Sequence, residues 1–593
     1  ICRLRLYAGH PYGDVRVTAY NATGATVSVQ ALRLADASSV NLGAAAAADR
    51  VLAETVSEDP SARIGGLAQA PPGGYVAYRD LLVYNRASRR SLLLAGLTAR
   101  RFLTVAQLRI HSKAAIAGLT LDDTGTTRAM LPRDPIPPAQ RMYLNLPLAP
   151  GAALDSEVVM VAVGPGFLAP LQRYGAAVRR LRLQFWGRSA SAAGVAPGAA
   201  ASQQGGTTGE PRASENVALP RFSSRPAPMG WWSWTAFYGG ITAGEVWTNA
   251  QWLAAHLTKL GYNFVHVDEG SNYARGEYTT ANATQFPHGM WRLEHRIRGL
   301  GLIPGVWTAP FEVSARAWVY QHHPDWLLHD AHGQPILVGY VHGHVDPLYV
   351  LDTTNPGAQR YLRRTYRILT RQWGVRYIKL DFMDAAAVEG DYYRPGTTAI
   401  QAQRIGLRII RQAVGPQVLL DKDGSLMLPP VGFVNEGRIA PDTGHSFAAS
   451  RDAVTNIASR IYMNRNFFVA DPDAFSVSRQ IEPQQQWHES QSGLTRNEAQ
   501  VQIVLAAMAG GMFEIGDDLP TLAAEPRRLA LVENQQIIDL NRLGRSALPL
   551  DLMTFPLQDA APSVFYLRED RRQAMLAVFN WTGHSTSHRI GLA

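Results

Sequence analysis

Apolar, strand-like runs alternate with helix-like patterns from Met229 onward, and this alternation constrains the fold more than any other feature. We interpret the strands as "MGWWSW", "YNFVHVD", "LIPGVWTAP", "VRYIKLD", "QVLLD", "GFVNEGRIAPD", "FFVADPD" and "GMFEIGD". Helix candidates such as "AGEVWTNAQWLAAHLTKL" and "TAIQAQRIGLRIIRQAV" lie between them. Eight such units over about 300 residues predict a (β/α)8 TIM barrel. A doubly wound sheet is the alternative, but no GxGxxG motif follows the first strand.

The segments on either side of the predicted barrel are rich in short strands without helices. Alternating runs such as "TVSVQALRL" and "RFLTVAQLRI" predict an N-terminal antiparallel β-sandwich, which a helix-like segment follows. A stretch rich in Ala, Gly, Ser and Pro then indicates a linker. The predicted domains are an N-terminal sandwich with its trailing helix (1–188), a linker (189–228), a catalytic barrel (229–546) and a small, incomplete C-terminal β-domain (547–593).

Composition and charge indicate which classes of partner the chain is able to bind. Its 593 residues are 46% hydrophobic and 18% charged, and no apolar run reaches the roughly 18 residues of a membrane-spanning helix. The net charge is +9, but the arginines are scattered rather than gathered into a stripe with aromatics, so we expect no nucleic-acid or membrane partner. Homo-oligomerisation stays open.

Cysteine usage leaves the compartment undecided. The single cysteine, Cys2, excludes an intrachain disulfide, and the chain begins at Ile1 rather than at methionine. Many periplasmic and secreted proteins also lack disulfides, and we favour such a location slightly over the cytoplasm.

Polar and aromatic residues close the apolar runs of the predicted barrel. Active sites of this fold lie at the carboxyl ends of the strands. The candidates there are Trp231, Trp234, Asp268, Glu269, Trp307, Lys379, Asp381, Asp421, Lys422, Asp423, Arg438, Asp442, Asp471, Asp473, Asp517 and Asp518. Any one aspartate in such a place is more often a helix cap. The joint pattern is more informative, because two of only four lysines in the chain, Lys379 and Lys422, lie at strand ends.

Carboxylates beside tryptophans are typical of sugar chemistry. A tryptophan face packs on a pyranose ring, charged groups bind its hydroxyls, and a pair of carboxylates breaks the glycosidic bond without a metal or cofactor. In "VRYIKLDFMD", Lys379 and Asp381 flank Leu380, so both side chains should point into the barrel mouth. We expect no metal at His342, His344 and Asp346, because alternating histidines in a loop are usually only solvated.

Three motifs in this region resemble those of the α-galactosidases of glycoside hydrolase family 36 and, more distantly, family 27. "GWWSW" resembles their Gly-Trp-x-x-Trp opening, "YIKLDF" their Lys-x-Asp motif and "GRIAPDTG" their Arg-x-x-x-Asp motif. The resemblance covers roughly 229–518, and the β-rich flanks fit the three-part layout of family 36.

The resemblance implies a retaining, exo-acting enzyme that releases terminal α-linked galactose from a carbohydrate. Asp381 would be the nucleophile and Asp442 the general acid/base. The implied substrate-binding residues are Trp231, Trp234, Asp268, Glu269, Trp307, Lys379, Asp421, Lys422 and Arg438.

Two departures from the family pattern leave the sugar open. The relatives have two aspartates where this chain has Asp268 and Glu269, and many have a cysteine where it has "LLDKDGS". The longer Glu269 could exclude a hydroxymethyl group, as a β-L-arabinopyranoside would require. The alternatives are therefore an α-N-acetylgalactosaminidase, a β-L-arabinopyranosidase, a raffinose-type galactosyl transferase and, least favoured, a non-catalytic sugar-binding protein.

Overall fold

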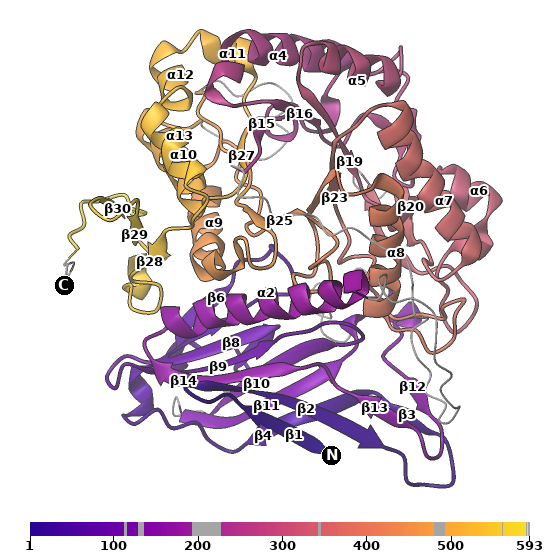
Figure 1. The fold of residues 1–593 in the computed structure, drawn as a ribbon, viewed down its shortest axis with the longest axis vertical. Helices are drawn as coiled ribbons and strands as arrows, with labels where there is room; N and C mark the ends of the chain where they lie inside the picture. Colours follow the sequence, from indigo (N-terminus) through magenta and orange to yellow (C-terminus); the bar gives the residue numbers. More distant parts are fainter. Residues whose placement is uncertain are drawn as a thin grey trace.

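A closed parallel barrel stands on an antiparallel β-sandwich, with a short β-sheet at its side (Figure 1). The computed structural model describes residues 1–111, 115–127, 136–191, 227–341, 345–479, 493–559, 561–588 and 590. None of the helices in these ranges is long and apolar enough to cross a membrane.

The N-terminal part consists of two packed antiparallel sheets. The larger has the order β1-β2-β14-β9-β8-β5-β6 with β13 on β2, the smaller has β4-β11-β10-β7, and β12 pairs with β3. The strands are β1 (Cys2–Leu6), β2 (Tyr12–Tyr20), β3 (Val27–Val29), β4 (Ala31–Ala37), β5 (Asp49–Ala53), β6 (Arg63–Gly66), β7 (Tyr75–Tyr78), β8 (Asp80–Asn85), β9 (Arg90–Gly96), β10 (Leu103–His111), β11 (Ala115–Thr124), β12 (Leu146–Leu148), β13 (Ala153–Asp155) and β14 (Val159–Pro165). Buried residues of both sheets, among them Val51, Val83, Leu108 and Leu121, form one core. The predicted sandwich is confirmed.

Helix α2 (Leu168–Ser191) runs between the sandwich and the barrel (Figure 1). Its Tyr174 hydroxyl donates to the carbonyl of Gly96 in β9 at 2.7 Å. At Gly175, a Cβ would lie 2.3 Å from the carbonyl oxygen of Tyr462, so only glycine allows the helix to approach the barrel this closely. The helix passes the predicted start of the linker at 189, and residues 192–226 lie outside the described ranges.

The barrel strands are parallel and follow the order β26-β25-β24-β23-β19-β16-β15-β27. They are β15 (Met229–Trp232), β16 (Phe264–Val267), β19 (Ile303–Thr308), β23 (Tyr377–Leu380), β24 (Leu419–Lys422), β25 (Glu436–Arg438), β26 (Val469–Asp471) and β27 (Phe513–Ile515). The Met512 amide donates to the Ala470 carbonyl at 2.8 Å, and this bond closes the ring between β26 and β27. The predicted (β/α)8 fold is confirmed.

Helices surround the ring, and several begin at capping boxes. Thr242, Thr398 and Thr495 each accept from the backbone three residues on, where a Glu or Gln side chain returns the bond. The helices are α3 (Trp234–Phe237), α4 (Ala243–His256), α5 (Met290–Gly299), α6 (Trp318–His322), α7 (Pro356–Arg367), α8 (Ala399–Val414), α9 (Phe447–Ser459), α10 (Arg496–Ala509), α11 (Leu519–Ala523), α12 (Pro526–Val532) and α13 (Gln535–Arg542).

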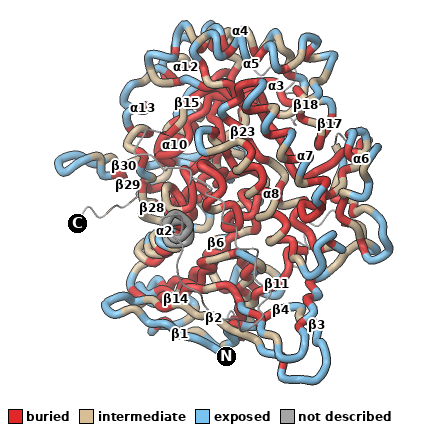
Figure 2. Tube along the Cα trace, turned by 45° about the vertical axis from the view of Figure 1, so that its right-hand side comes forward, coloured by how far each residue is buried: buried red, intermediate tan, exposed pale blue. Residues whose placement is uncertain are grey.

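Two small antiparallel sheets are inserted after β16 and β19, and a third follows α13. They are formed by β17 (Asn272–Ala274) and β18 (Glu277–Ala281), by β20 (Glu312–Ser314), β21 (Leu337–Val341) and β22 (Asp346–Val350), and by β28 (Leu548–Pro549), β29 (Val564–Arg568) and β30 (Ala574–Val578). The barrel strands are buried, whereas the loop between β29 and β30 and the edge strand β1 are exposed (Figure 2).

Candidate active site

Lys379 lies at the centre of a ring of carboxylates at the carboxyl ends of the barrel strands. Its Nζ is 2.9 Å from Asp423 Oδ2, 3.1 Å from Asp268 Oδ2 and 3.5 Å from Asp381 Oδ2. Burial alone would disfavour its charge, but Asp268, Asp423 and Asp381 raise the pKa of Lys379 well above its ordinary value. The side chain is therefore a buried ammonium group that holds three strands together at one rim.

Asp381 follows directly after β23 and is fixed by two further donors. Trp307 Nε1 donates to its Oδ2 at 2.9 Å, and the amide of Phe382 donates to its Oδ1 at 2.7 Å. Burial and the neighbouring Asp423 raise the pKa of Asp381, while Lys379 and Trp307 act in the opposite direction. A carboxylate that is both buried and oriented in this way suits nucleophilic attack at a fixed point.

Gly424 allows the backbone after β24 to approach Asp381. A Cβ there would lie 2.5 Å from the amide nitrogen of Phe382 and 2.7 Å from Asp381 Oδ1. Gly424 also has a φ of +45°, which L side chains rarely adopt. A side chain at position 424 would therefore collide with Asp381 and Phe382, which explains the glycine in "DKDG".

Arg438 connects the centre of the site to Asp442. Its guanidinium contacts Asp423 at 2.9 Å, Asp473 at 2.7 Å and Asp442 at 2.5 Å. The Asp442 side chain is 63% exposed, whereas that of Asp381 is 13% exposed. The two carboxylates therefore lie in different surroundings, one at the floor of the site and one open to water.

Arg275, in the turn between β17 and β18, occupies the far side of the site. It donates to both oxygens of Glu269, at 2.8 and 2.9 Å, and to Glu312 at 2.7 Å. Its guanidinium carbon lies 4.0 Å from the centre of the Phe382 ring and 5.4 Å from that of Trp307. Glu269 is thus held beside Asp268 by an arginine that no motif had indicated.

Two predicted binding residues, Trp231 and Lys422, lie away from the ring of carboxylates around Lys379. Trp231 is fully buried, and its Nε1 donates to the Asp517 carbonyl outside the barrel ring. The next residue, Trp232, points inward instead, with Nε1 on Asp268 at 2.5 Å. Lys422 faces the sandwich, where its Nζ contacts Glu58 at 3.0 Å.

Asp421 points into the barrel but lies one layer below the rim. It accepts from the Tyr377 hydroxyl at 2.9 Å, and burial raises its pKa well above the ordinary value. Asp423, two residues on and on the same face of the strand, lies at the rim, where it contacts Lys379 and Arg438. Although burial opposes ionisation, Arg438 and Lys379 hold the pKa of Asp423 well below its usual range.

The remaining candidates have mixed roles. Trp234 is half-buried at the start of α3 and packs edge-on against Tyr238. Asp518 caps α11 by accepting from Thr521, as the common behaviour of aspartate after a strand suggests. Asp346 accepts from Ser314, while His342 and His344 lie outside the described ranges. Within those ranges, no group of three or more His, Cys, Asp or Glu residues could hold a metal ion.

The chain folds into a (β/α)8 barrel with carboxylates and tryptophans at the carboxyl ends of its strands, and comparison with known proteins shows similarity to glycosidases. A family model described as Melibiase matches residues 213–406. Probable alpha-galactosidase G of Emericella nidulans is 25% identical over 184 residues, which are 28% of this chain and 24% of that protein. An alpha-galactosidase of Escherichia coli is 24% identical over 196 residues, 32% of this chain and 25% of that protein. The matched segments thus span about a quarter of these curated relatives.

Solved structures share the fold along most of the chain. TtGalA, an alpha-galactosidase from Thermus thermophilus in complex with stachyose, has a TM-score of 0.59 at 20% identity, with 90% of this chain and 99% of that chain covered. The family 36 alpha-galactosidase AgaA from Geobacillus stearothermophilus, as a variant in complex with raffinose, has a TM-score of 0.61 at 14% identity, with 96% and 71% covered. The resemblance to family 36 α-galactosidases is confirmed.

Proposed function

We propose that this protein is a retaining, exo-acting α-galactosidase that uses Asp381 as nucleophile and Asp442 as general acid/base. The observation that carries the proposal is the arrangement of these two carboxylates. They are linked through Lys379, Asp423 and Arg438, and the Asp381 side chain is far less exposed than that of Asp442.

In the first step, an Asp381 oxygen forms a bond to the anomeric carbon, and the bond from that carbon to the leaving oxygen breaks. Asp442 gives its proton to the leaving oxygen, and its exposure places it where the departing sugar and the incoming water pass. In the second step, Asp442 takes a proton from water, the water oxygen bonds to the anomeric carbon, and Asp381 is released.

The charges around the site support these steps. Asp381 must be ionised to attack, and the Lys379 ammonium and the Trp307 N–H both stabilise its charged form. Asp268 and Asp423 leave lone pairs that can accept from sugar hydroxyls, and charge-assisted bonds of this kind are about twice as strong as neutral ones.

A β-L-arabinopyranosidase is the second candidate, because Arg275 and Glu269 lie beside Asp268. A bulky ion pair in this place would leave less room for the hydroxymethyl group of galactose. The transferase alternative shares the same covalent intermediate and differs only in the acceptor.

A hydrolysis screen tests the proposal and separates the alternatives. The purified protein would be assayed on nitrophenyl α-galactoside, nitrophenyl α-N-acetylgalactosaminide and nitrophenyl β-L-arabinopyranoside, with Asp381→Asn as the inactive control. We expect the highest kcat/KM on the α-galactoside. Preference for either other substrate would replace the proposed sugar, and no turnover of any of the three would contradict a glycosidase of this type.

A further inference from the structure

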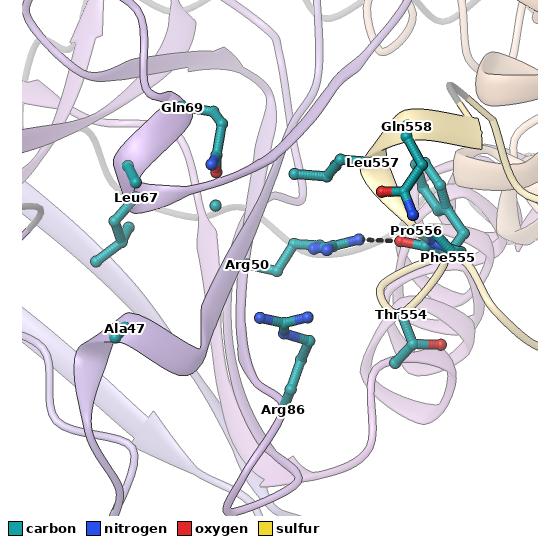
Figure 3. A pocket seen from close by; sticks show the side chains of 12 residues that line it. Ala47, Arg50, Leu67, Gln69, Arg86, Thr554, Phe555, Pro556, Leu557 and Gln558 are labelled. Carbon is teal, nitrogen blue, oxygen red and sulfur yellow. Dashed lines mark hydrogen bonds between the residues drawn. The ribbon is translucent and has the colours of Figure 1, made fainter.

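A cavity of about 600 Å³ lies between the sandwich and the segment that follows β28 (Figure 3). From the sandwich side it is lined by Arg50 of β5, Arg86 after β8 and Gln69 of the short helix η2 (Leu67–Gln69). Phe555, Leu557 and Gln558 line the opposite side. Neither side contains a residue of the candidate active site.

Arg50 is the buried charge of this cavity. The residue is 4% exposed, and its Nη1 donates to the Phe555 carbonyl at 2.6 Å, which ties the two sides together. Its Nε is also buried but has no hydrogen-bond partner among the described residues. In Figure 3 the guanidinium groups of Arg50 and Arg86 lie near each other at the centre of the lining residues.

No carboxylate of the described residues forms an ion pair with Arg50 or Arg86. None of the residues that line the cavity is Asp or Glu. Burial and the neighbouring charge of Arg86 lower the pKa of Arg50. A buried cation without a counter-ion is costly, so an anion that entered the cavity would be stabilised there.

We propose that this cavity binds a small organic oxyanion, a molecule that carries a carboxylate, sulfate or phosphate group on an uncharged body. One guanidinium group can donate to two oxygens of such an anion at once, and a second arginine beside it adds charge and further donors. The cavity volume falls in the range of about 300–1,000 Å³ typical of ligand sites, more than one bare anion fills. Leu67 and Leu557 provide apolar surface for the body, and the side-chain amides of Gln69 and Gln558 can bind its hydroxyls. This inference does not depend on the proposed catalytic function.

Titration calorimetry on the full chain tests the site with four probes: galactose 6-phosphate, galacturonate, inorganic phosphate and uncharged galactose. Galactose is titrated into the Asp381→Asn variant of the protein. The test variant is Arg86→Gln, because Arg86 is exposed and its loss should leave the fold intact. The matched control is Arg90→Gln, an exposed arginine of β9 that does not line the cavity. Arg50→Lys keeps the buried charge but removes the paired donors.

We expect the two sugar acids to bind and Arg86→Gln to weaken their binding about tenfold, as loss of one charged hydrogen bond predicts. Arg50→Lys should weaken it similarly, and Arg90→Gln should not change it. If inorganic phosphate binds as tightly as the ester, the oxyanion site stands and the free anion is its source. Equal binding of the two sugar acids in Arg86→Gln and wild type, or no binding of any charged probe at millimolar concentration, would overturn the proposal. Neither result would affect the hydrolysis screen.

Discussion

Asp423 lies between the two cations of the candidate site, and this gives it an influence on the nucleophile. Its carboxylate accepts from Lys379 and Arg438, both at 2.9 Å, and it remains charged. After burial, its negative charge is the main factor that raises the pKa of Asp381. Asp421, which the resemblance implies as a substrate-binding residue, lies deeper and accepts from the Tyr377 hydroxyl instead.

Asp423→Asn should therefore lower the pKa of Asp381, because the amide carries no negative charge and leaves Lys379 free to pair with the nucleophile. In the proposed mechanism Asp381 must be ionised to attack, so the acidic limb of kcat/KM against pH should move to lower pH, with lower activity overall. The profile would be measured with nitrophenyl α-galactoside. Asp391→Asn, an exposed position in the loop after β23, should leave the limb in place. A limb that stays or moves to higher pH in Asp423→Asn would contradict this account.

We expect Glu269 to affect the choice of sugar rather than the bond-breaking steps. Both of its oxygens accept from Arg275, so shortening the side chain should break or displace this ion pair and open space beside Asp268. Glu269→Asp should raise the ratio of α-galactoside to β-L-arabinopyranoside turnover by more than about twofold. Glu277→Asp, in the neighbouring strand β18, is the control. An unchanged ratio would show that the ion pair does not contact the far end of the sugar ring.

The barrel strands stack their inward side chains in layers. Phe264, Tyr377 and Met512 form an apolar bottom layer. Above it, β24 to β27 contribute one carboxylic acid each, listed in order as Asp421, Glu436, Asp471 and Glu514. Burial, with the charges of neighbouring acids, raises the pKa of all four, and that of Glu436 to about 8. This middle layer lies below the rim that holds Lys379 and Arg438.

Glu436 should make folding pH-dependent in a direction opposite to that of an ordinary ion pair. The folded protein keeps its proton up to about pH 8, whereas the unfolded chain loses it near pH 4.5. Its contribution to stability is thus complete below pH 4.5 and falls as the pH rises toward 8. In wild type, this group should lower the free energy of unfolding between pH 5 and pH 8 by on the order of a few kcal/mol. Glu436→Gln should remove this loss, because the amide does not ionise.

Urea unfolding at the two pH values would measure this difference, with the exposed Glu533→Gln as control. If Glu436→Gln shows the same pH dependence as wild type, the acid is not protonated in the folded barrel.

The order and type of the barrel elements could be predicted from the sequence because each strand is an apolar run between helix patterns. The exact residue at which a strand ends could not be predicted in the same way. A shift of one residue moves a side chain to the other face, and for this reason the sequence indicates Trp231 rather than Trp232 and includes Lys422 beside Asp423. Arg275 lies in an inserted hairpin without a motif. Glu58 meets Lys422 from more than three hundred positions away, and no local pattern indicates such a contact.

The sandwich and the barrel form one assembly through buried polar contacts. Arg460, directly after α9, donates to Glu54 at 2.8 Å and to Thr55 at 2.9 Å, and it also binds the Ile439 carbonyl of the barrel at 2.7 Å. Arg79 of the sandwich lies 3.1 Å from the same Glu54. These contacts place the loop between β5 and β6 beside the barrel.

Arg460→Met should destabilise the whole molecule by about 3–5 kcal/mol, because it leaves Glu54 buried with only one of its two arginines. Thermal unfolding would show a lower midpoint, and a separate transition for the sandwich if the contact couples the two parts. Arg451→Met, at a half-buried position in α9, should change the midpoint little. Equal midpoints for Arg460→Met and wild type would show that the parts are held together by other contacts.

The proposed mechanism depends on a covalent bond between the sugar and Asp381, and trapping that bond tests it most directly. The protein would be incubated with 5-fluoro-α-galactosyl fluoride, whose ring fluorine slows the second step more than the first, and then digested and analysed by mass spectrometry. We predict one fluorogalactosyl group on the peptide that contains Asp381, and none in Asp381→Asn. A label on Asp442 or another carboxylate, or rapid turnover of nitrophenyl α-galactoside to β-galactose as first product without any label, would contradict the account.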